Sequence, residues 1–287
     1  MEQYKCCIGL CVYNSSLGLP PVIENINKIS QCFKQTNVIF YYDYSRDNTL
    51  NIIETFMNDT NKKNLSVEII HNISPKGISR TENIANARNG ILSRIRDCYN
   101  DYEFFIMMDA NEYACIGEIN IPVFREVFEP TKINEWDAVS FDREAGYYDT
   151  WALSFGNYVY SFSHFDNWKK VVECMRKEFN ELLNDYKSRE EFIPVYSAFN
   201  GLAIYKTNNF IDCIYTDIIF THLFLPSLVE KQVEITGCQI KYNITNDTEH
   251  RHFHLQSIKK NNSKIRIFPK YLFFKIPVPN PSLRGPA

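Results

Sequence analysis

Residues 104–108 form a short apolar run that ends abruptly on polar side chains. The run is too short for a helix and predicts a strand buried on both faces. Asp109, Asn111 and Glu112 follow it directly. Positions i and i+2 of an extended backbone point to the same side, so Asp109 and Asn111 can face one ion together. Their oxygen atoms suit Mg²⁺ or Mn²⁺, whereas the alternative is that Asp109 opens a turn that Asn111 fills.

Three of the six histidines, His250, His252 and His254, fall close together. In an extended backbone all three imidazoles face one side, whereas in a helix only His250 and His254 share a face. One of them could complete an octahedral metal site begun by Asp109 and Asn111, and the alternative is a packing or surface cluster. The pattern is not H-E-x-x-H, so it does not indicate a zinc protease.

A second acidic strand end and two arginines predict a site for an anionic ligand. Asp43 ends another apolar run, and Arg80 and Arg88 lie near the amino end of an amphipathic pattern over 81–98. Guanidinium groups and the free amides of a helix start bind anionic oxygens, while the alternative is that these arginines are solvated or pair with Glu82. Together with the acidic end of 104–108, they indicate a nucleoside diphosphate accompanied by a divalent cation.

The elements that must position these side chains follow an α/β pattern. The first seventy residues alternate strand and helix, which implies a parallel sheet with helices on its faces. Strands are predicted at about 5–13, 38–42, 65–70, 104–108 and 138–141, and helices at about 20–33, 48–56, 81–98, 123–128 and 168–190. A strand-like segment with a break at Gly201 is predicted at 195–205, and a further strand at 238–244.

The totals exclude several classes of protein. The chain has 287 residues, nine cysteines without a C-x-x-C pair, and a formal net charge of −3. Neither a zinc knuckle, a disulfide framework nor a nucleic-acid binder is indicated. No signal peptide and no apolar stretch of about 20 residues is present, so we expect a cytoplasmic protein with reduced cysteines and no transmembrane segment.

These pieces stand in the order found in a known family. Over roughly residues 5–256 the chain resembles glycosyltransferases of the nucleotide-diphospho-sugar transferase superfamily, which have the GT-A fold. Residues 42–49 resemble an element that contacts the base or ribose, and 77–80 with 86–89 resemble an element near the diphosphate. Asp109-Ala-Asn111 stands at the metal-binding D-x-D position.

The resemblance implies a Rossmann-like, mostly parallel sheet flanked by helices, with a mixed α+β acceptor-side half. We predict one domain over 1–276, divided at 113/114 into a nucleotide-binding and an acceptor-side half, and a Pro-rich tail over 277–287. The donor-binding residues are then Tyr13, Asp43, Arg80, Asn83, Arg88 and Asp109, and the metal ligands Asp109, Asn111 and one of His250, His252 and His254.

The D-x-D position departs from the family, because Asn111 replaces its second aspartate. A neutral amide oxygen holds a cation less strongly than a carboxylate does. Glu112 could substitute, or the metal, Mn²⁺ or Mg²⁺, could bind chiefly through the nucleotide.

A weaker resemblance, to the Cap59-type mannosyltransferase-like group, covers 147–153, 199–205 and Glu249-His250. The aromatic residues of 147–151 could cover apolar sugar faces. An inverting transferase needs a general base near the acceptor hydroxyl, and the candidates are Asp149, Asp142 and Glu144. The spacing of these residues does not choose among them.

The predicted activity is transfer of a sugar from a UDP- or GDP-sugar to a glycan or glycoprotein acceptor. One alternative is a nucleotidyltransferase, which usually has a Gly-rich basic loop after the first strand; here residues 14–21 have one glycine and no basic residue. The other is a non-catalytic carbohydrate-binding or scaffold protein, which Asn111 supports.

Overall fold

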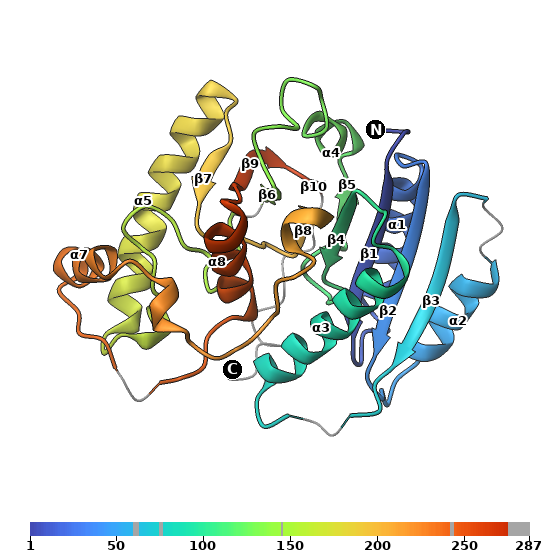
Figure 1. The fold of residues 1–287 in the computed structure, drawn as a ribbon, viewed down its shortest axis with the longest axis horizontal. Helices are drawn as coiled ribbons and strands as arrows, with labels where there is room; N and C mark the ends of the chain where they lie inside the picture. The colour runs from blue at the N-terminus through green and yellow to red at the C-terminus, as the bar shows by residue number, and fades with distance from the viewer. Residues whose placement is uncertain (60–62, 75–76, 145, 242–243, 275–287) are drawn as a thin grey trace.

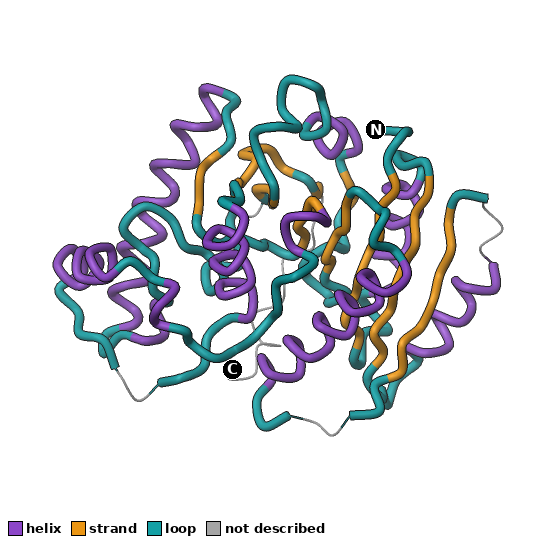
Figure 2. Tube along the Cα trace, in the orientation of Figure 1, coloured by secondary structure: helices purple, strands orange, loops and turns teal. Residues whose placement is uncertain are grey.

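The computed structural model describes residues 1–59, 63–74, 77–144, 146–241 and 244–274. Its centre is an eight-stranded sheet with the order β3-β2-β1-β4-β8-β6-β9-β7, and a small second sheet pairs β10 with β5. Figures 1 and 2 show helices on both sides of the large sheet. The strands are β1 Lys5–Val12, β2 Gln35–Tyr42, β3 Leu65–His71, β4 Phe104–Met108, β5 Glu118–Ile119, β6 Ala138–Asp142, β7 Ile193–Val195, β8 Leu202–Lys206, β9 Ile265–Tyr271 and β10 Phe273–Phe274.

Alternating side chains of the buried strands separate the apolar core into two layers. Cys6 and Ile8 of β1 pack with α1, α2 and α4 on one face, while Cys7 packs with α3, α5 and α8 on the other. The helices are α1 Leu19–Ser30, α2 Thr49–Asp59, α3 Arg80–Cys98, α4 Ile121–Glu126, α5 Trp168–Arg189, α6 Thr207–Phe210, α7 Pro226–Thr236 and α8 Glu249–Asn261, with short 3₁₀ turns at Phe162–His164 and Thr221–Leu223.

Strand direction decides where polar side chains can meet. β1 pairs in parallel with β2 and β4, and β2 in parallel with β3. β8 runs antiparallel to both β4 and β6, so β4 and β6 point the same way. The carboxyl ends of β1, β2, β4 and β6 therefore lie at one edge of the sheet. The predicted α/β class, a mostly parallel sheet flanked by helices, is confirmed.

The five predicted helices and the first five predicted strands are present, with ends shifted by a few residues. The strand-like segment over 195–205 divides into the end of β7 and most of β8. Asn200 and Gly201 separate them with positive φ angles of 57° and 92°. A Cβ on Gly201 would lie 2.9 Å from the Cβ of Ala114, so this close approach requires glycine.

The second half differs most from the expectations. The strand predicted at 238–244 is absent from its described residues, 238–241 and 244, where Ile240 forms only an isolated bridge with Phe165. The Pro-rich tail lies outside the described residues, and the division into two halves stays a prediction. No helix in the described ranges has both the length and the apolar character to cross a membrane.

Candidate active site

A buried arginine connects the elements that meet at this edge of the sheet. Arg88 lies on the face of α3 that also carries Ile91 and Ile95, and its side chain is 7% exposed. Its Nη2 lies 3.3 Å from Asp109 Oδ1, after β4, and its Nη1 lies 3.4 Å from Glu249 Oε1, at the start of α8. A buried charge destabilises the fold unless it is paired in this way. The pair of ionic contacts therefore joins α3 to both β4 and α8.

The environment of Arg88 is consistent with a permanent positive charge. Burial alone lowers the pKa of the Arg88 guanidinium, but the carboxylates of Glu249 and Asp109 outweigh burial and hold that pKa above its usual range. The guanidinium carbon lies 4.5 Å from the centre of the Phe199 ring, and an Nη atom contacts the imidazole of His250. Arg88 is thus held from several sides.

Asp109 lies where the sequence predicts it, directly after β4. Its backbone N–H donates to the carbonyl of Gly201 at 2.8 Å. Burial raises the pKa of the Asp109 carboxyl to about 6, Arg88 opposes that shift, and Glu249 adds to it. The Asn111 Oδ1 accepts from the N–H groups of Tyr113 and Ala114, at 3.1 and 2.7 Å, so the turn predicted as the alternative is present.

Asp149 lies beside this cluster, although it follows a different strand. Its Oδ1 accepts from the N–H of Ala152 at 3.1 Å, and its own N–H donates to Asn200 Oδ1 at 3.3 Å. Burial raises the pKa of the Asp149 carboxyl to about 7, and the negative charges of Asp109 and Glu249 add to that rise. A carboxyl with a pKa near neutrality can act as a general base at physiological pH.

The three histidines lie on a helix, α8, so they divide between two faces as the helical alternative predicts. His250 stacks on the ring of Phe199, with centroids 3.9 Å apart, and belongs to the Arg88 cluster. His254 uses both ring nitrogens, at 2.9 Å from Ser197 Oγ and 3.1 Å from Tyr205 Oη. Its hydrogen bonds therefore leave no ring nitrogen for a metal.

His252 points elsewhere, because its Nε2 accepts from the N–H of Phe220 at 3.3 Å. Burial lowers the pKa of His252 to about 4 and that of His254 to about 3, so both rings are neutral at physiological pH. Of the three, only His250 contacts Arg88, which in turn pairs with Asp109.

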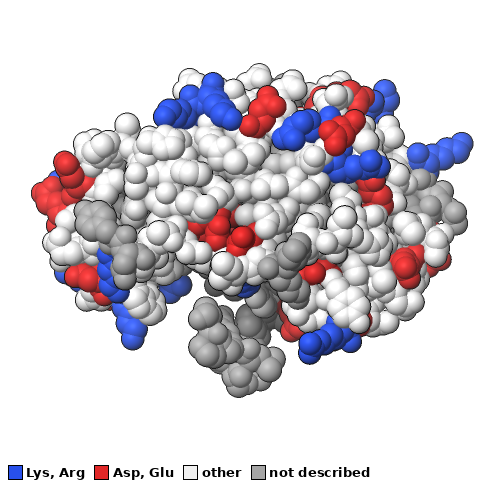
Figure 3. All heavy atoms as spheres, turned by 60° about the horizontal axis from the view of Figure 1, so that its bottom comes forward, with Lys and Arg blue, Asp and Glu red and all other residues white. Residues whose placement is uncertain are grey.

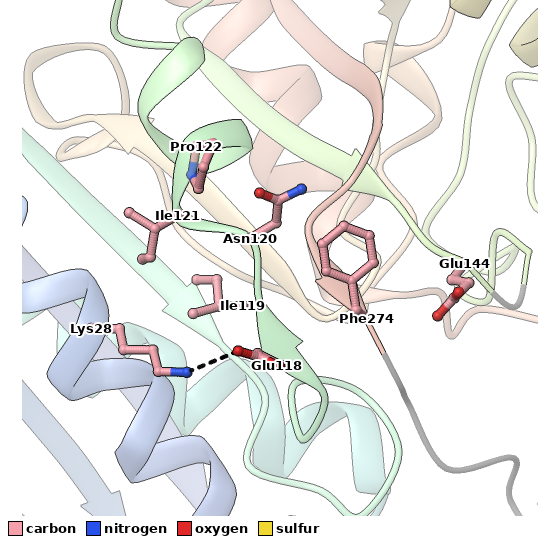
Figure 4. A pocket seen from close by; sticks show the side chains of 8 residues that line it. All are labelled: Lys28, Glu118, Ile119, Asn120, Ile121, Pro122, Glu144 and Phe274. Carbon is pink, nitrogen blue, oxygen red and sulfur yellow. Dashed lines mark ion pairs between the residues drawn. The ribbon is translucent and has the colours of Figure 1, made fainter.

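The other two candidate bases lie apart from the cluster. Asp142, at the end of β6, forms an ion pair with Lys187 Nζ of α5 at 2.5 Å. Glu144 is exposed and lines a separate cavity of about 640 Å³, which Lys28 and Phe274 also line. Figure 4 shows this cavity, with the ion pair between Lys28 and Glu118 within it. The geometry thus favours Asp149 over Asp142 and Glu144.

The remaining predicted donor residues lie directly after β1 and β2 and in the first turn of α3. Tyr13, after β1, is 50% exposed. The Asp43 Oδ1, after β2, accepts from the N–H of Tyr44 at 2.9 Å. Arg80 is exposed at the first turn of α3, and its positive charge acts on Asp109. Asn83 instead holds the preceding loop, since its Oδ1 accepts from a backbone N–H at 2.7 Å and its Nδ2 donates to a carbonyl at 2.7 Å.

The sequence does not identify three residues that the structure places here. Glu249 is the second carboxylate partner of Arg88, and Cys11, at the end of β1, adjoins the same guanidinium. The Asp217 Oδ2 accepts from the hydroxyl groups of Ser79 and Thr81, at 2.9 and 3.2 Å, and thereby fixes the start of α3. The sequence signals for Glu249 are its place directly before His250 and the weaker resemblance to the Cap59-type group, and neither predicts its pairing with Arg88. Figure 3 shows acidic side chains gathered near the middle of one face of the molecule.

No protein-family model and no curated protein matches the sequence. Among solved structures, residues 1–349 of S. aureus TarS match at 14% identity and a TM-score of 0.45, over 94% of this chain and 59% of that chain. The Pyrobaculum calidifontis mannosyltransferase with GDP-Man and Mn²⁺ matches at 13% and 0.37, over 72% and 46%. Mycobacterium tuberculosis glucosyl-3-phosphoglycerate synthase with Mn²⁺, UDP and phosphoglyceric acid matches at 10% and 0.41, over 72% and 57%.

The names of the last two proteins agree with the predicted resemblance to glycosyltransferases. This chain spans only 46% to 59% of the lengths of the three proteins. At identities of 10–14% and TM-scores of 0.37–0.45, these similarities do not establish what this chain does. The resemblance to the Cap59-type group stays a prediction.

Proposed function

We propose that the protein transfers a sugar from a nucleoside diphosphate sugar to a hydroxyl group of an acceptor. The observation that supports this most directly is the cluster of Asp109, Asp149 and Glu249 near Arg88, at the edge where β4 and β6 end. Ligands of α/β sheets bind at this edge. The cluster combines a fixed cation with the carboxyl groups of Asp109 and Asp149, whose pKa values lie near neutrality, as a proton transfer next to a phosphate group requires.

The donor fits the side of the edge nearer to β2. Tyr13 and Asp43 follow adjacent parallel strands, so both can reach one nucleoside. Arg80 stands at the amino end of α3, where its own charge and the helix dipole favour an anion. The diphosphate would then lie between Arg80 and Asp109. UDP- and GDP-sugars are equally compatible with these residues.

A divalent cation fits this arrangement through Asp109. Among the described residues, no group of three or more His, Cys, Asp and Glu side chains could hold a metal ion by itself. Mg²⁺ is, however, commonly held by one or two carboxylates together with substrate phosphates, and Mn²⁺ accepts the same ligands. Asp109 would supply the carboxylate. When bound, Mn²⁺ or Mg²⁺ would stabilise negative charge on the leaving diphosphate.

We assign the base to Asp149. It would accept the proton of the acceptor hydroxyl while that oxygen attacks the anomeric carbon and the diphosphate leaves. Burial, together with the negative charges of Asp109 and Glu249, favours the protonated form of Asp149 and raises its affinity for that proton to the level that neutral pH demands. The acceptor, a glycan or a glycoprotein, would approach from the side of residues 147–151.

A panel of nucleotide sugars, tested with and without Mn²⁺, decides whether the proposal holds. We expect one UDP- or GDP-sugar to raise the melting temperature in a Mn²⁺-dependent manner and to be hydrolysed slowly without an acceptor. A protein that binds a nucleotide sugar but never cleaves it would instead be the non-catalytic carbohydrate-binding protein, which the engagement of Asn111 Oδ1 in a turn favours. Absence of any nucleotide binding would contradict the proposed transferase.

A further inference from the structure

Arg143 is a buried cation without a carboxylate partner. Three arginines within the described ranges are buried: Arg88, Arg143 and Arg251. Arg88 pairs with carboxylates as described above, and Arg251 Nε lies 2.7 Å from Asp247 Oδ2. Arg143, 6% exposed, forms no ion pair with any carboxylate in the part of the chain that the structure describes. Its situation therefore differs from that of both other buried arginines.

The contacts of Arg143 satisfy only part of its guanidinium. The Nη2 donates to the carbonyl of Tyr113 at 2.5 Å, and the guanidinium carbon lies 5.2 Å from the centre of the Tyr148 ring. The Nε is buried and has no hydrogen-bond partner. Burial lowers the pKa of the Arg143 guanidinium, and only Tyr148 and Cys115 oppose that shift. A buried charge in such a state destabilises the protein unless a ligand supplies the missing counter-charge and hydrogen-bond acceptors.

The position of Arg143 relates it to the acceptor. Arg143 directly follows β6. In the sheet, β4 and β8 lie between β6 and the strands β1 and β2, next to which we place the donor. Tyr113 comes from the loop after Asp109, and Tyr148 directly precedes Asp149. The rings of Tyr113 and Tyr148 contact each other edge to face, with centroids 5.9 Å apart, and each residue is 37% exposed. The negative charges of Asp109 and Asp149 act on the Tyr148 hydroxyl, and the Arg143 guanidinium lies against the Tyr148 ring, so a ligand that contacts Tyr148 lies near both Arg143 and Asp149.

We propose that Arg143, Tyr113 and Tyr148 form a subsite for an anionic oxygen group, a phosphate or a carboxylate, carried by the acceptor. The inference rests on the proposed function, because only that function distinguishes an acceptor side from a donor side. A guanidinium matches the geometry of carboxylate and phosphate groups with paired N–H donors, and the two rings can cover the apolar part of the same ligand. The acceptor would then be charged, and its anionic group would orient its hydroxyl toward Asp149.

Isothermal titration of the intact chain, with and without UDP or GDP, tests the subsite. The probes are glycerol phosphate, glycerate and, as the uncharged counterpart, glycerol. We expect one or both anions to bind and glycerol not to bind, and the tighter anion identifies the group. Arg143→Met should weaken anion binding about ten-fold or more, and should leave nucleotide affinity within about two-fold. Arg266→Met is the matched control, because Arg266 is partly buried and lies near the start of β9. Since β9 is parallel to β6, Arg266 lies toward the amino ends of these strands, away from Arg143 at the carboxyl end of β6.

Several results would overturn the subsite. One is equal binding of anions and glycerol, or no anion binding, by the wild-type chain. Another is an Arg143→Met variant whose melting temperature falls while its anion affinity stays normal, because Arg143 would then only brace Tyr113. A loss of nucleotide affinity in that variant would assign Arg143 to the donor. Nucleotide binding by the wild-type chain is a separate measurement, and its failure contradicts the proposed function rather than the subsite.

If Arg143→Met does not fold, Arg143→Lys decides. Lysine keeps the charge but loses the paired N–H geometry, so anion affinity should fall several-fold at constant nucleotide affinity. Unchanged anion affinity in Arg143→Lys would contradict the subsite.

Discussion

The Nη2 atom of Arg88 lies 3.3 Å from the Oδ1 atom of Asp109, and this ion pair joins the middle of α3 to the end of β4. Both side chains belong to the predicted donor site, but Arg88 is buried and Asp109 is partly exposed. We therefore expect Arg88 to act on a bound ligand chiefly by fixing and polarising Asp109. Arg80, at the first turn of the same helix, is exposed, and we expect this arginine to contact the proposed diphosphate directly.

Loss of Arg88 should destabilise the fold as well as the site. Arg88→Met leaves the Glu249 and Asp109 carboxylates without a buried counter-charge, so we expect the free energy of unfolding to fall by about 3–5 kcal/mol. Arg94→Met on the same helix is the control, since Arg94 pairs with Glu68 at 2.7 Å but is 42% exposed. Its loss should cost at most about 1 kcal/mol. Urea unfolding measures both, and equal costs would contradict the role of Arg88.

Asp109 should control the binding of a divalent cation. We expect Asp109→Asn to abolish Mn²⁺ binding in the presence of UDP or GDP, because a neutral amide holds a cation less strongly than a carboxylate. Asp101→Asn, at an exposed acid paired with Lys5, is the control and should bind Mn²⁺ normally. Calorimetric titration of Mn²⁺ into each nucleotide complex makes the comparison. Normal Mn²⁺ affinity in Asp109→Asn would show that the ion is held elsewhere.

Asp43 should contact the nucleoside. Removal of one partner of a buried polar contact costs about 1–3 kcal/mol, so Asp43→Ala should weaken nucleotide binding roughly five- to a hundred-fold. Asp43 also accepts from the N–H of Tyr44 within its own loop. Circular dichroism and melting temperature should therefore accompany the calorimetry. An intact variant with wild-type affinity would remove Asp43 from the site.

The parts of this fold that could be predicted are those encoded locally. The apolar run of β4 and its polar end are adjacent in sequence, and so are the buried stripe of α3 and its arginines. The partnership of Arg88 with Glu249 joins residues far apart in the chain, and no periodicity records it. The histidine cluster shows the same limit. His250 stacks on Phe199 and His254 forms a hydrogen bond with Ser197, and both contacts depend on how α8 packs against the rest of the fold.

β9 is a second case in which local pattern fails. No strand is predicted over Ile265–Tyr271, and the segment contains Pro269, a residue that central strands rarely tolerate. β9 is nevertheless held between β6 and β7. Its pairing with β6 shifts register between Phe141 and Asp142, next to the position where the chain leaves the sheet toward Arg143. Tertiary pairing therefore overrides local preference here.

The raised pKa values of Asp149 and Asp109 predict a pH dependence of stability. A carboxyl whose pKa is higher in the folded than in the unfolded chain stabilises the fold while it is protonated. That contribution is complete below about pH 4, where the unfolded carboxyl is also protonated, and is lost as pH rises through about 6 for Asp109 and about 7 for Asp149. Asp149→Asn should therefore melt higher relative to wild type at pH 8 than at pH 5. A difference independent of pH would place the pKa of Asp149 at its ordinary value.

The last prediction separates Asp142, the last residue of β6, from Asp149 in the loop that follows. A base acts mainly in the transition state, so its loss lowers turnover while donor binding persists. We expect Asp149→Asn to fold normally, to bind donor nucleotide normally and to lose most transfer to acceptor, with wild-type transfer declining below about pH 7 as Asp149 becomes protonated. Asp142→Asn breaks the buried ion pair with Lys187 and should instead lower the melting temperature. If Asp149→Asn retained near-normal transfer, or if its donor binding fell together with its melting temperature, the base would have to be sought among other residues.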